Sequence, residues 1–232
     1  FSGSYFVELQ MAGEPLLHPE LGRIISLIKN AGLRVGLSTN GILLLEMCAA
    51  VSNLDYLTIS LDGIDTYPEI RIGGSLDRVI RGIDAVLSQS KHPKIDLQVI
   101  NLPQSIPFHQ LIRFAEERHW PVVCRQVPDC FLAYRNQPFP SERLSELCLN
   151  PWLSVSVQYE GSVVPCCFSF GRQVIYGNLH EADLKTIWLN SEARQQLITR
   201  QLAGRNEIPC SLCYMRSPAL FHLKMLMEEL KC

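Results

Sequence analysis

Apolar side chains over residues 1–130 follow two alternating patterns. Continuous apolar runs of strand length are separated by segments in which apolar positions recur with helical spacing, as at Leu21, Ile25 and Ile28. The apolar runs predict strands at Tyr5–Met11, Arg34–Ser38, Tyr56–Leu61, Ile95–Ile100 and Val122–Val127. The segments between them predict helices at Pro19–Ala31, Leu43–Val51, Leu76–Ser88 and Pro107–Arg118. Regular alternation of this kind is typical of βαβ units, so we expect an α/β fold with a parallel sheet that is closed or partly closed into a barrel.

The pattern changes after residue 130. Pro, Asn and Gln are frequent up to Pro140, which favours a linker over residues 131–147. Apolar and polar residues then alternate over Trp152–Gln158, and Glu160-Gly161 forms a turn before Val163-Val164, which predicts a hairpin. Helical patterns follow at Leu184–Leu189, Glu192–Leu202 and Pro218–Lys231. We therefore expect three parts: a barrel domain over 1–130, the linker, and a small hairpin-plus-helices domain over 148–232.

Charge and hydropathy exclude two classes of partner. The 21 Lys and Arg are interspersed among 23 Asp and Glu, with no basic run that would favour nucleic acid. No apolar stretch approaches the roughly 20 residues of a membrane-spanning helix. The chain starts at Phe1 without a signal peptide, which favours a cytoplasmic protein and a natural start upstream of this residue.

Cysteine use gives the first indication of chemistry. Six of the nine cysteines follow residue 147, namely Cys148, Cys166, Cys167, Cys210, Cys213 and Cys232. In a reducing compartment clustered cysteines are better explained as metal ligands than as disulfides. Cys210-Ser211-Leu212-Cys213 has the spacing that directs two thiolates to one metal, and the hairpin can supply two more. Four thiolates bind an iron–sulfur cluster or zinc equally well, so spacing alone leaves both open.

Polar motifs follow the predicted strands of the first domain at matching positions. They are Ala12-Gly13-Glu14-Pro15, Ser38-Thr39-Asn40-Gly41, and Ser60-Leu61-Asp62-Gly63 with Arg71 shortly after. Each could be turn chemistry when taken alone. Because parallel strands bring their carboxyl ends to one edge, the motifs should instead surround a common ligand site.

Together these motifs resemble the core of radical S-adenosylmethionine (SAM) enzymes, over residues 5 to about 127. The resemblance implies a partial (β/α)6 barrel that binds SAM. It also implies a contact between the Gly13-Glu14-Pro15 loop and the amino group of the methionine moiety. Its remaining implied cofactor residues are Thr39, Asn40, Ser60, Asp62, Arg71, Val99 and Ile100, with Ser60 and Arg71 on ribose and carboxylate, and the last two flanking adenine.

Two departures from the family pattern matter. Ala12 replaces the first glycine of the usual Gly-Gly-Glu-Pro. The Cys-x3-Cys-x2-Cys motif that holds the SAM-cleaving 4Fe-4S cluster is absent from this chain, and its place in the family lies upstream of Phe1. We expect a chain that lacks the first βα unit of its barrel, with that cluster on the missing segment. The alternative is a relative without the cluster.

The C-terminal cysteines resemble a second family element. Cys148, Gly161, Cys166, Tyr176-Gly177-Asn178-Leu179 and the Cys210–Cys213 pair are similar to a short SPASM domain, the auxiliary iron–sulfur appendage of many radical SAM enzymes. The resemblance favours iron–sulfur over zinc and implies one 4Fe-4S auxiliary cluster on Cys148, Cys166, Cys210 and Cys213. Cys167 is the alternative to Cys166, because adjacent strand residues point to opposite faces.

The resemblance implies a radical SAM oxidoreductase that generates a 5′-deoxyadenosyl radical for hydrogen abstraction. A peptide or protein is the expected substrate, with a sugar or other small molecule, or methyl transfer, as alternatives. An electron donor such as flavodoxin or ferredoxin is implied as a partner. Two other hypotheses stay open at this point: a non-catalytic module that binds a peptide or partner, and a zinc-stabilised structural protein.

Overall fold

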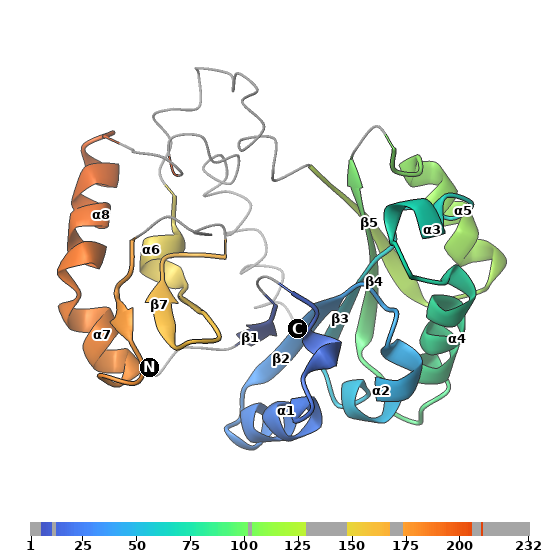
Figure 1. The fold of residues 1–232 in the computed structure, drawn as a ribbon, viewed down its shortest axis with the longest axis horizontal. Helices are drawn as coiled ribbons and strands as arrows, with labels where there is room; N and C mark the ends of the chain where they lie inside the picture. The colour runs from blue at the N-terminus through green and yellow to red at the C-terminus, as the bar shows by residue number, and fades with distance from the viewer. Residues whose placement is uncertain are drawn as a thin grey trace. The chain divides into compact units, whose positions relative to one another are not determined.

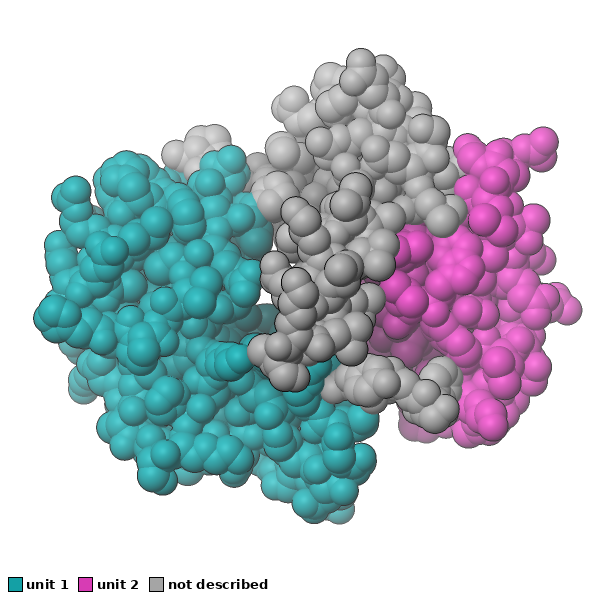
Figure 2. Space-filling model, turned by 180° about the vertical axis from the view of Figure 1, so that it is seen from behind, with its two compact units in different colours: residues 1–129 teal, residues 130–232 magenta. Residues whose placement is uncertain are grey.

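The computed structural model describes residues 6–10, 13–101, 104–128, 148–167, 174–205 and 210. The chain divides into two compact units, residues 1–129 and 130–232 (Figure 2). The predicted linker, the predicted helix Pro218–Lys231, and Ala12, Cys213 and Cys232 lie outside the described residues.

The first unit contains a five-stranded parallel sheet in the order β1-β2-β3-β4-β5. Its strands are β1 (Phe6–Leu9), β2 (Arg34–Thr39), β3 (Tyr56–Ser60), β4 (Lys94–Asn101) and β5 (Val122–Pro128). The register pairs Leu37 with Leu57, and Leu57 with Ile95, so apolar side chains on neighbouring strands share one face. The predicted α/β class and all five predicted strands are confirmed, with ends that differ by one or two residues in the described range.

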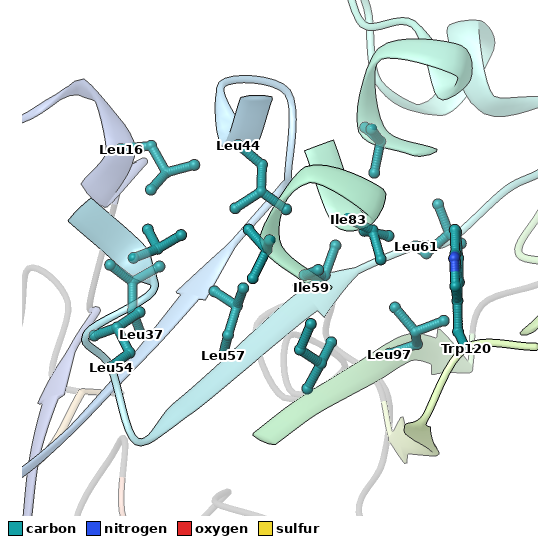
Figure 3. Close-up of a cluster of buried hydrophobic side chains, with 14 of the residues drawn as sticks. Leu16, Leu37, Leu44, Leu54, Leu57, Ile59, Leu61, Ile83, Leu97 and Trp120 are labelled. Carbon is teal, nitrogen blue, oxygen red and sulfur yellow. The ribbon is translucent and has the colours of Figure 1, made fainter. Parts of the chain in front are cut away.

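Helices cover that apolar face of the sheet (Figure 1). They are α1 (Leu21–Asn30), α2 (Leu44–Val51), α3 (Tyr67–Ile70), α4 (Leu76–Leu87) and α5 (Phe108–Glu117), with a short 3-10 helix, η1, at Pro15–Leu17. Figure 3 shows Leu37, Leu57, Ile59 and Leu97 of the strands pointing toward Leu44 and Ile83 of the helices. The sequence missed η1 and α3, each of which is about one turn long.

Local sequence explains how the longest of these helices, α4, begins and packs. The hydroxyl of Ser75 accepts a hydrogen bond from the backbone N–H of Arg78, an N-cap that satisfies one of the unpaired amides of the first turn. Gly82 then allows close packing, because a Cβ there would lie 2.9 Å from Leu44 Cβ and 3.0 Å from the backbone nitrogen of Leu45. The close contact between α2 and α4 therefore depends on the absence of a side chain at Gly82.

The opposite face of the sheet carries polar side chains. Strand alternation places one row of residues away from the helices: Glu8, Ser38, Thr58, Asp96, Gln98 and Arg125. Two pairs on this face interact: Ser38 donates to Glu8 Oε1 at 3.0 Å, and Arg125 Nε donates to Asp96 Oδ2 at 2.6 Å. A sheet that is apolar on the helix side and polar on the other has a surface suited to a polar ligand.

The second unit combines a small antiparallel sheet with helices. Its strands β6 (Ser156–Val157), β7 (Ser162–Val164) and β8 (Gly177–Asn178) pair in that order. Its helices are α6 (Asn150–Leu153), α7 (Leu184–Asn190) and α8 (Glu192–Leu202). The predicted hairpin and both predicted helices in the described range are confirmed, but the placement of Trp152 and Leu153 in a strand was wrong, since they end helix α6.

The core of the second unit is small. Its buried members among the described residues are Val163, Tyr176, Ile187 and Leu197, with Cys210 packed against them. Asp183 is the N-cap of α7, and its carboxylate accepts from Thr186 N at 3.0 Å; Ser191 is the N-cap of α8. No helix in the described ranges of either unit has the length and hydropathy to span a membrane.

Candidate cofactor and cluster sites

Glu14 connects the first two strand ends of the sheet. Its Oε1 accepts hydrogen bonds from Leu16 N at 3.1 Å and from the Thr39 hydroxyl at 2.6 Å, and its Oε2 accepts from Asn40 N at 2.9 Å. Thr39 is 3% exposed, and its oxygen also accepts from Gly41 N. The carboxylate is therefore fixed in one orientation by backbone and side-chain donors, as a ligand-binding group requires.

Two glycines of these motifs adopt conformations that other residues rarely reach. Gly13, with φ of +109°, has no heavy atom within 4 Å of an added Cβ, so the loop beside Glu14 faces open space. Gly41, with φ of +78°, packs so closely that a Cβ would lie 3.0 Å from Val79 Cγ1. The first glycine leaves room for a ligand at the backbone, and the second turns the chain into α2.

Tyr67 extends this hydrogen-bonded series to the third strand. Its side chain is completely buried, and its hydroxyl donates to the carbonyl oxygen of Asn40 at 3.3 Å. Burial raises the pKa of this phenol; the charge of Arg71 opposes the shift, while Asp62 and Glu14 add to it. Tyr67 thus contacts the end of β2 and lies within electrostatic range of the charged residues that follow β1 and β3.

Asp62 and Arg71 form the next link. Arg71 Nη2 donates to Asp62 Oδ2 at 2.6 Å, and Ile100 N donates to Asp62 Oδ1 at 2.9 Å. The Asp62 side chain is only 5% exposed, and its backbone oxygen accepts from Ile106 N. One carboxylate therefore joins the end of β3, the segment after α3, and β4.

Arg71 retains an unused donor. Its Nε is buried and has no acceptor among the described residues, although Nη2 is paired with Asp62. A buried donor of this kind is costly unless a ligand supplies an acceptor. The carboxylate or ribose oxygens of SAM would meet that need, so the residues present fit this cofactor.

The other predicted SAM residues lie around the same edge. Ser60 ends β3 and is half-buried. Val99 is fully buried in the core, and the amide of Ile100 donates to Asp62 Oδ1. The structure brings together the motifs of β1, β2, β3 and β4, while the predicted contacts of each residue with SAM stay predictions.

Glu8 is a polar strand residue near the strand-end motifs that the sequence did not single out. It lies on the polar face of β1, where burial raises the pKa of its carboxyl and the Ser38 hydrogen bond opposes that shift. Gly36, its partner in the register, makes the space, because a side chain there would collide with the Glu8 carboxylate and the Phe6 ring. The signal available in the sequence was the position of this acidic residue between two apolar strand residues, Val7 and Leu9.

The described cysteines of the second unit come from three separate segments. Cys148 precedes α6, Cys166 and Cys167 follow β7, and Cys210 follows α8. The amide of Cys148 donates to the Oε1 atom of Gln201, which is 5% exposed, at 3.3 Å. In the described ranges no three His, Cys, Asp or Glu side chains are arranged as a metal site, and Cys213 is not among those residues.

Tyr176 is a buried residue of the small core against which Cys210 packs. Burial raises the pKa of its phenol; the charge of Arg194 opposes the shift, and the charges of Cys166, Cys210 and Cys148 add to it. That hydroxyl is buried without a partner among the described residues, so the surroundings fit a sulfur-rich centre with open acceptor positions. Tyr176 and Arg194 were not predicted as site residues.

Comparison with family models identifies both units. Residues 7–99 match the radical SAM superfamily, and residues 148–214 match SPASM, described as an iron-sulfur cluster-binding domain. By these matches the chain contains a radical SAM domain and a SPASM domain. SAM and iron–sulfur clusters are the cofactors of these two domains, so the predicted preference for iron–sulfur over zinc is confirmed at the level of the domain.

Curated relatives are similar to part of this chain. A probable GTP 3′,8-cyclase of Methanococcus maripaludis is 38% identical over 86 residues, 35% of this chain and 29% of the relative. An S-adenosylmethionine-dependent nucleotide dehydratase of a Thermoplasmatales archaeon is 30% identical over 94 residues, 38% of this chain and 34% of the relative. The chain matches about a third of the length of these relatives, both of which are named as enzymes.

A solved structure resembles both units. Streptococcus suis SuiB bound to S-adenosylmethionine superimposes with a TM-score of 0.60 at 14% identity, over 91% of this chain and 60% of that chain. This likeness confirms the predicted fold class, a partial barrel of the radical SAM type followed by a small cysteine-rich domain.

Proposed function

We propose that the protein containing this chain is a radical SAM oxidoreductase that generates a 5′-deoxyadenosyl radical for hydrogen abstraction. The observation that carries the proposal is the hydrogen-bonded series from Glu14 through Asn40 and Tyr67 to Arg71 and Asp62, which ends in an unused Arg71 donor. When SAM and its reducing cluster are bound, they supply the radical. The residues of this chain hold and orient the cofactor.

Each residue of the series has a defined task in this proposal. The Glu14 carboxylate, held by three donors, receives the ammonium of the methionine moiety beside the open Gly13 backbone. Arg71 and Ser60 receive the carboxylate and ribose. Such fixed charged groups hold a reactive bond in place at little entropic cost during the reaction.

The SPASM unit supplies an auxiliary 4Fe-4S cluster in this proposal. Cys148, Cys166, Cys210 and Cys213 are the proposed ligands, with Cys167 as the alternative to Cys166. A cluster held by these residues would supply a centre for substrate binding or for electron uptake. A flavodoxin or ferredoxin supplies the electron that starts turnover.

For the substrate we propose a peptide or protein first, supported by the presence of a SPASM domain. A nucleotide or other small molecule is the second candidate, and two observations favour it. The relatives that are 30–38% identical carry nucleotide chemistry in their names. The face of the sheet away from the helices is also lined with charged and polar groups, among them Glu8, Asp96 and Arg125.

The test of the proposed activity is formation of 5′-deoxyadenosine. The full-length protein is purified anaerobically, reconstituted with iron and sulfide, and given SAM and a chemical reductant. Arg71→Lys should lower 5′-deoxyadenosine formation at least tenfold, because lysine cannot reproduce the guanidinium donors. Arg23→Lys is the matched control, since Arg23 lies on the exposed side of α1 and bonds only Glu20. Loaded protein that makes no 5′-deoxyadenosine would contradict the proposal.

Substrate class is tested by the rise of 5′-deoxyadenosine above its background. Synthetic peptides form one arm, and GTP, taken from the names of the relatives, forms the nucleotide arm. A rise with peptides only supports the first candidate, and a rise with GTP only supports the second. A colourless protein with stoichiometric zinc would contradict the auxiliary cluster.

A further inference from the structure

The hydroxyl of Tyr176 is a polar group placed where the protein offers it no partner. The residue is 6% exposed, its ring meets Trp188 edge to face with centroids 6.5 Å apart, and its oxygen is buried without a hydrogen bond among the described residues. The packing of the ring needs no hydroxyl. A buried, unpaired O–H costs free energy unless an acceptor is present in the working protein.

Three predicted cluster ligands are the neighbours that could provide this acceptor. Tyr176 N donates to Val163 O at 2.7 Å, which fixes the residue beside β7, the strand that leads to Cys166. Cys210 packs against the same small core that contains Tyr176. The charges of Cys166, Cys210 and Cys148 all act on the pKa of the phenol. The hydroxyl is therefore within electrostatic reach of thiols from all three described segments.

We propose that the Tyr176 hydroxyl donates a hydrogen bond to a sulfur of the auxiliary iron–sulfur cluster and raises its reduction potential. The proposal rests on the proposed function only in requiring that this cluster exists. Cluster sulfurs gain negative charge on reduction, so a donor at this point stabilises the reduced form more than the oxidised form. Tyr176 acts as a positioning and tuning residue and is not a ligand.

Arg194 adds to the same effect at longer range. Its guanidinium donates to Pro151 O at 3.0 Å and to Trp188 O at 3.2 Å, and it stacks on the Trp188 ring at 3.8 Å. Its positive charge also acts on Tyr176. Because Arg194 holds α6 and α7 together, its removal would disturb the structure, so it is not used in the test.

The experiment is a redox titration of the full-length, cluster-loaded protein, followed by electron paramagnetic resonance. The auxiliary signal is identified as the one that is lost in Cys210→Ala. In Tyr176→Phe the midpoint potential of that signal should shift to lower values while iron content is retained. Tyr159→Phe is the matched control, because Tyr159 is fully exposed in the same unit, and it should leave the potential unchanged.

A second variant keeps the experiment informative if Tyr176→Phe loads iron poorly. Tyr176→meta-fluorotyrosine retains the ring and the hydroxyl but makes the hydroxyl a stronger donor. It should shift the potential upward, opposite to phenylalanine.

Opposite shifts in the two variants support the hydrogen bond. Loaded protein in which both variants keep the wild-type potential and spectrum overturns the inference, and it leaves the proposed function intact. Wild-type protein without an auxiliary signal contradicts the cluster itself, so the two failures are distinguishable.

Discussion

The Asp62 carboxylate, which we expect to contribute to SAM binding, makes two contacts within the protein. Its two oxygens accept from Arg71 Nη2 and from Ile100 N, and only 5% of the side chain is exposed. At this position a carboxylate acts by orienting the arginine and the end of β4. The effect of its removal should therefore depend on Arg71.

Asp62→Asn should weaken SAM binding on the order of tenfold, because asparagine can still accept from Ile100 N but loses the charge-assisted bond to Arg71. Isothermal titration of the full-length, cluster-loaded protein with SAM measures this change. Asp65→Asn, at an exposed position nearby, is the control. If Arg71→Ala and Asp62→Asn had additive effects on affinity, Asp62 would not be acting through Arg71.

Glu8→Gln should stabilise the protein at neutral pH. Burial raises the pKa of this carboxyl in the folded state, so the folded protein favours the protonated form, and stability is lost as the pH rises through that pKa. Glutamine has no charge to desolvate, and its advantage should disappear below the ordinary pKa of glutamate. Thermal unfolding of wild type and variant across this pH range measures the difference. A difference that does not depend on pH would contradict the assignment.

Sequence predicted the residues of the strand-end motifs but not Glu8 or Tyr176. Glycines and acidic residues after an apolar strand are local signals of a ligand site. The role of Glu8 depends on Gly36 in the neighbouring strand, and that of Tyr176 depends on cysteines far along the chain. Contacts of that kind are created by the tertiary fold and have no local pattern.

At the level of elements, α4 packs closely on α2 because Gly82 has no side chain. Gly82→Ala should destabilise the first unit by about 1–2 kcal/mol, because the added methyl meets the backbone nitrogen of Leu45, which cannot move aside, and overpacking outweighs the gain in helix propensity. Chemical denaturation of the two proteins measures the change.

Gly22→Ala provides the comparison within α1. A Cβ at Gly22 would lie 3.4 Å from Ala50 Cβ, an ordinary contact, so alanine should stabilise the helix by up to about 1 kcal/mol. Equal effects of the two substitutions would show that the close packing at Gly82 has no energetic importance.

Long elements could be predicted from sequence, whereas short ones could not. Helix α8 was predicted with its observed ends, since it has a capping serine and a first-turn glutamate. Helix α6 was taken for a strand because Trp152–Gln158 alternates in polarity, although Pro151 at the start of the helix favoured a helical turn. In elements of about one turn, the signal from capping residues and the signal from the spacing of apolar residues have similar strength and can favour different structures.

The two units differ greatly in the size of their cores. The cluster of buried side chains in the second unit has four members among the described residues, whereas that of the first unit extends across strands β2, β3 and β4 and the helices that cover them. A core of this size supplies little stability of its own, so we expect the second unit to depend on its metal centre.

Removal of iron and sulfide should therefore increase amide hydrogen exchange over residues 148–205 and leave residues 13–101 nearly unchanged. Hydrogen–deuterium exchange with mass spectrometry, before and after chelation, measures both ranges in one sample. Restoration of protection by reconstitution is the control. Unchanged exchange in the second unit after complete metal loss would mean that its packing suffices without the cluster.

The hydrogen bond between Cys148 and Gln201 also has a consequence for biosynthesis. It joins positions 53 residues apart, and Cys210 follows later still. A growing chain that has not yet emerged as far as α8 carries Cys148 and Cys166 but lacks the side chain that holds the first of them. Nearly the whole unit must therefore be synthesised before the first and last of the proposed cysteine ligands can come close to each other. Loading of a cluster onto all of its proposed ligands thus has to wait until this whole unit has been synthesised.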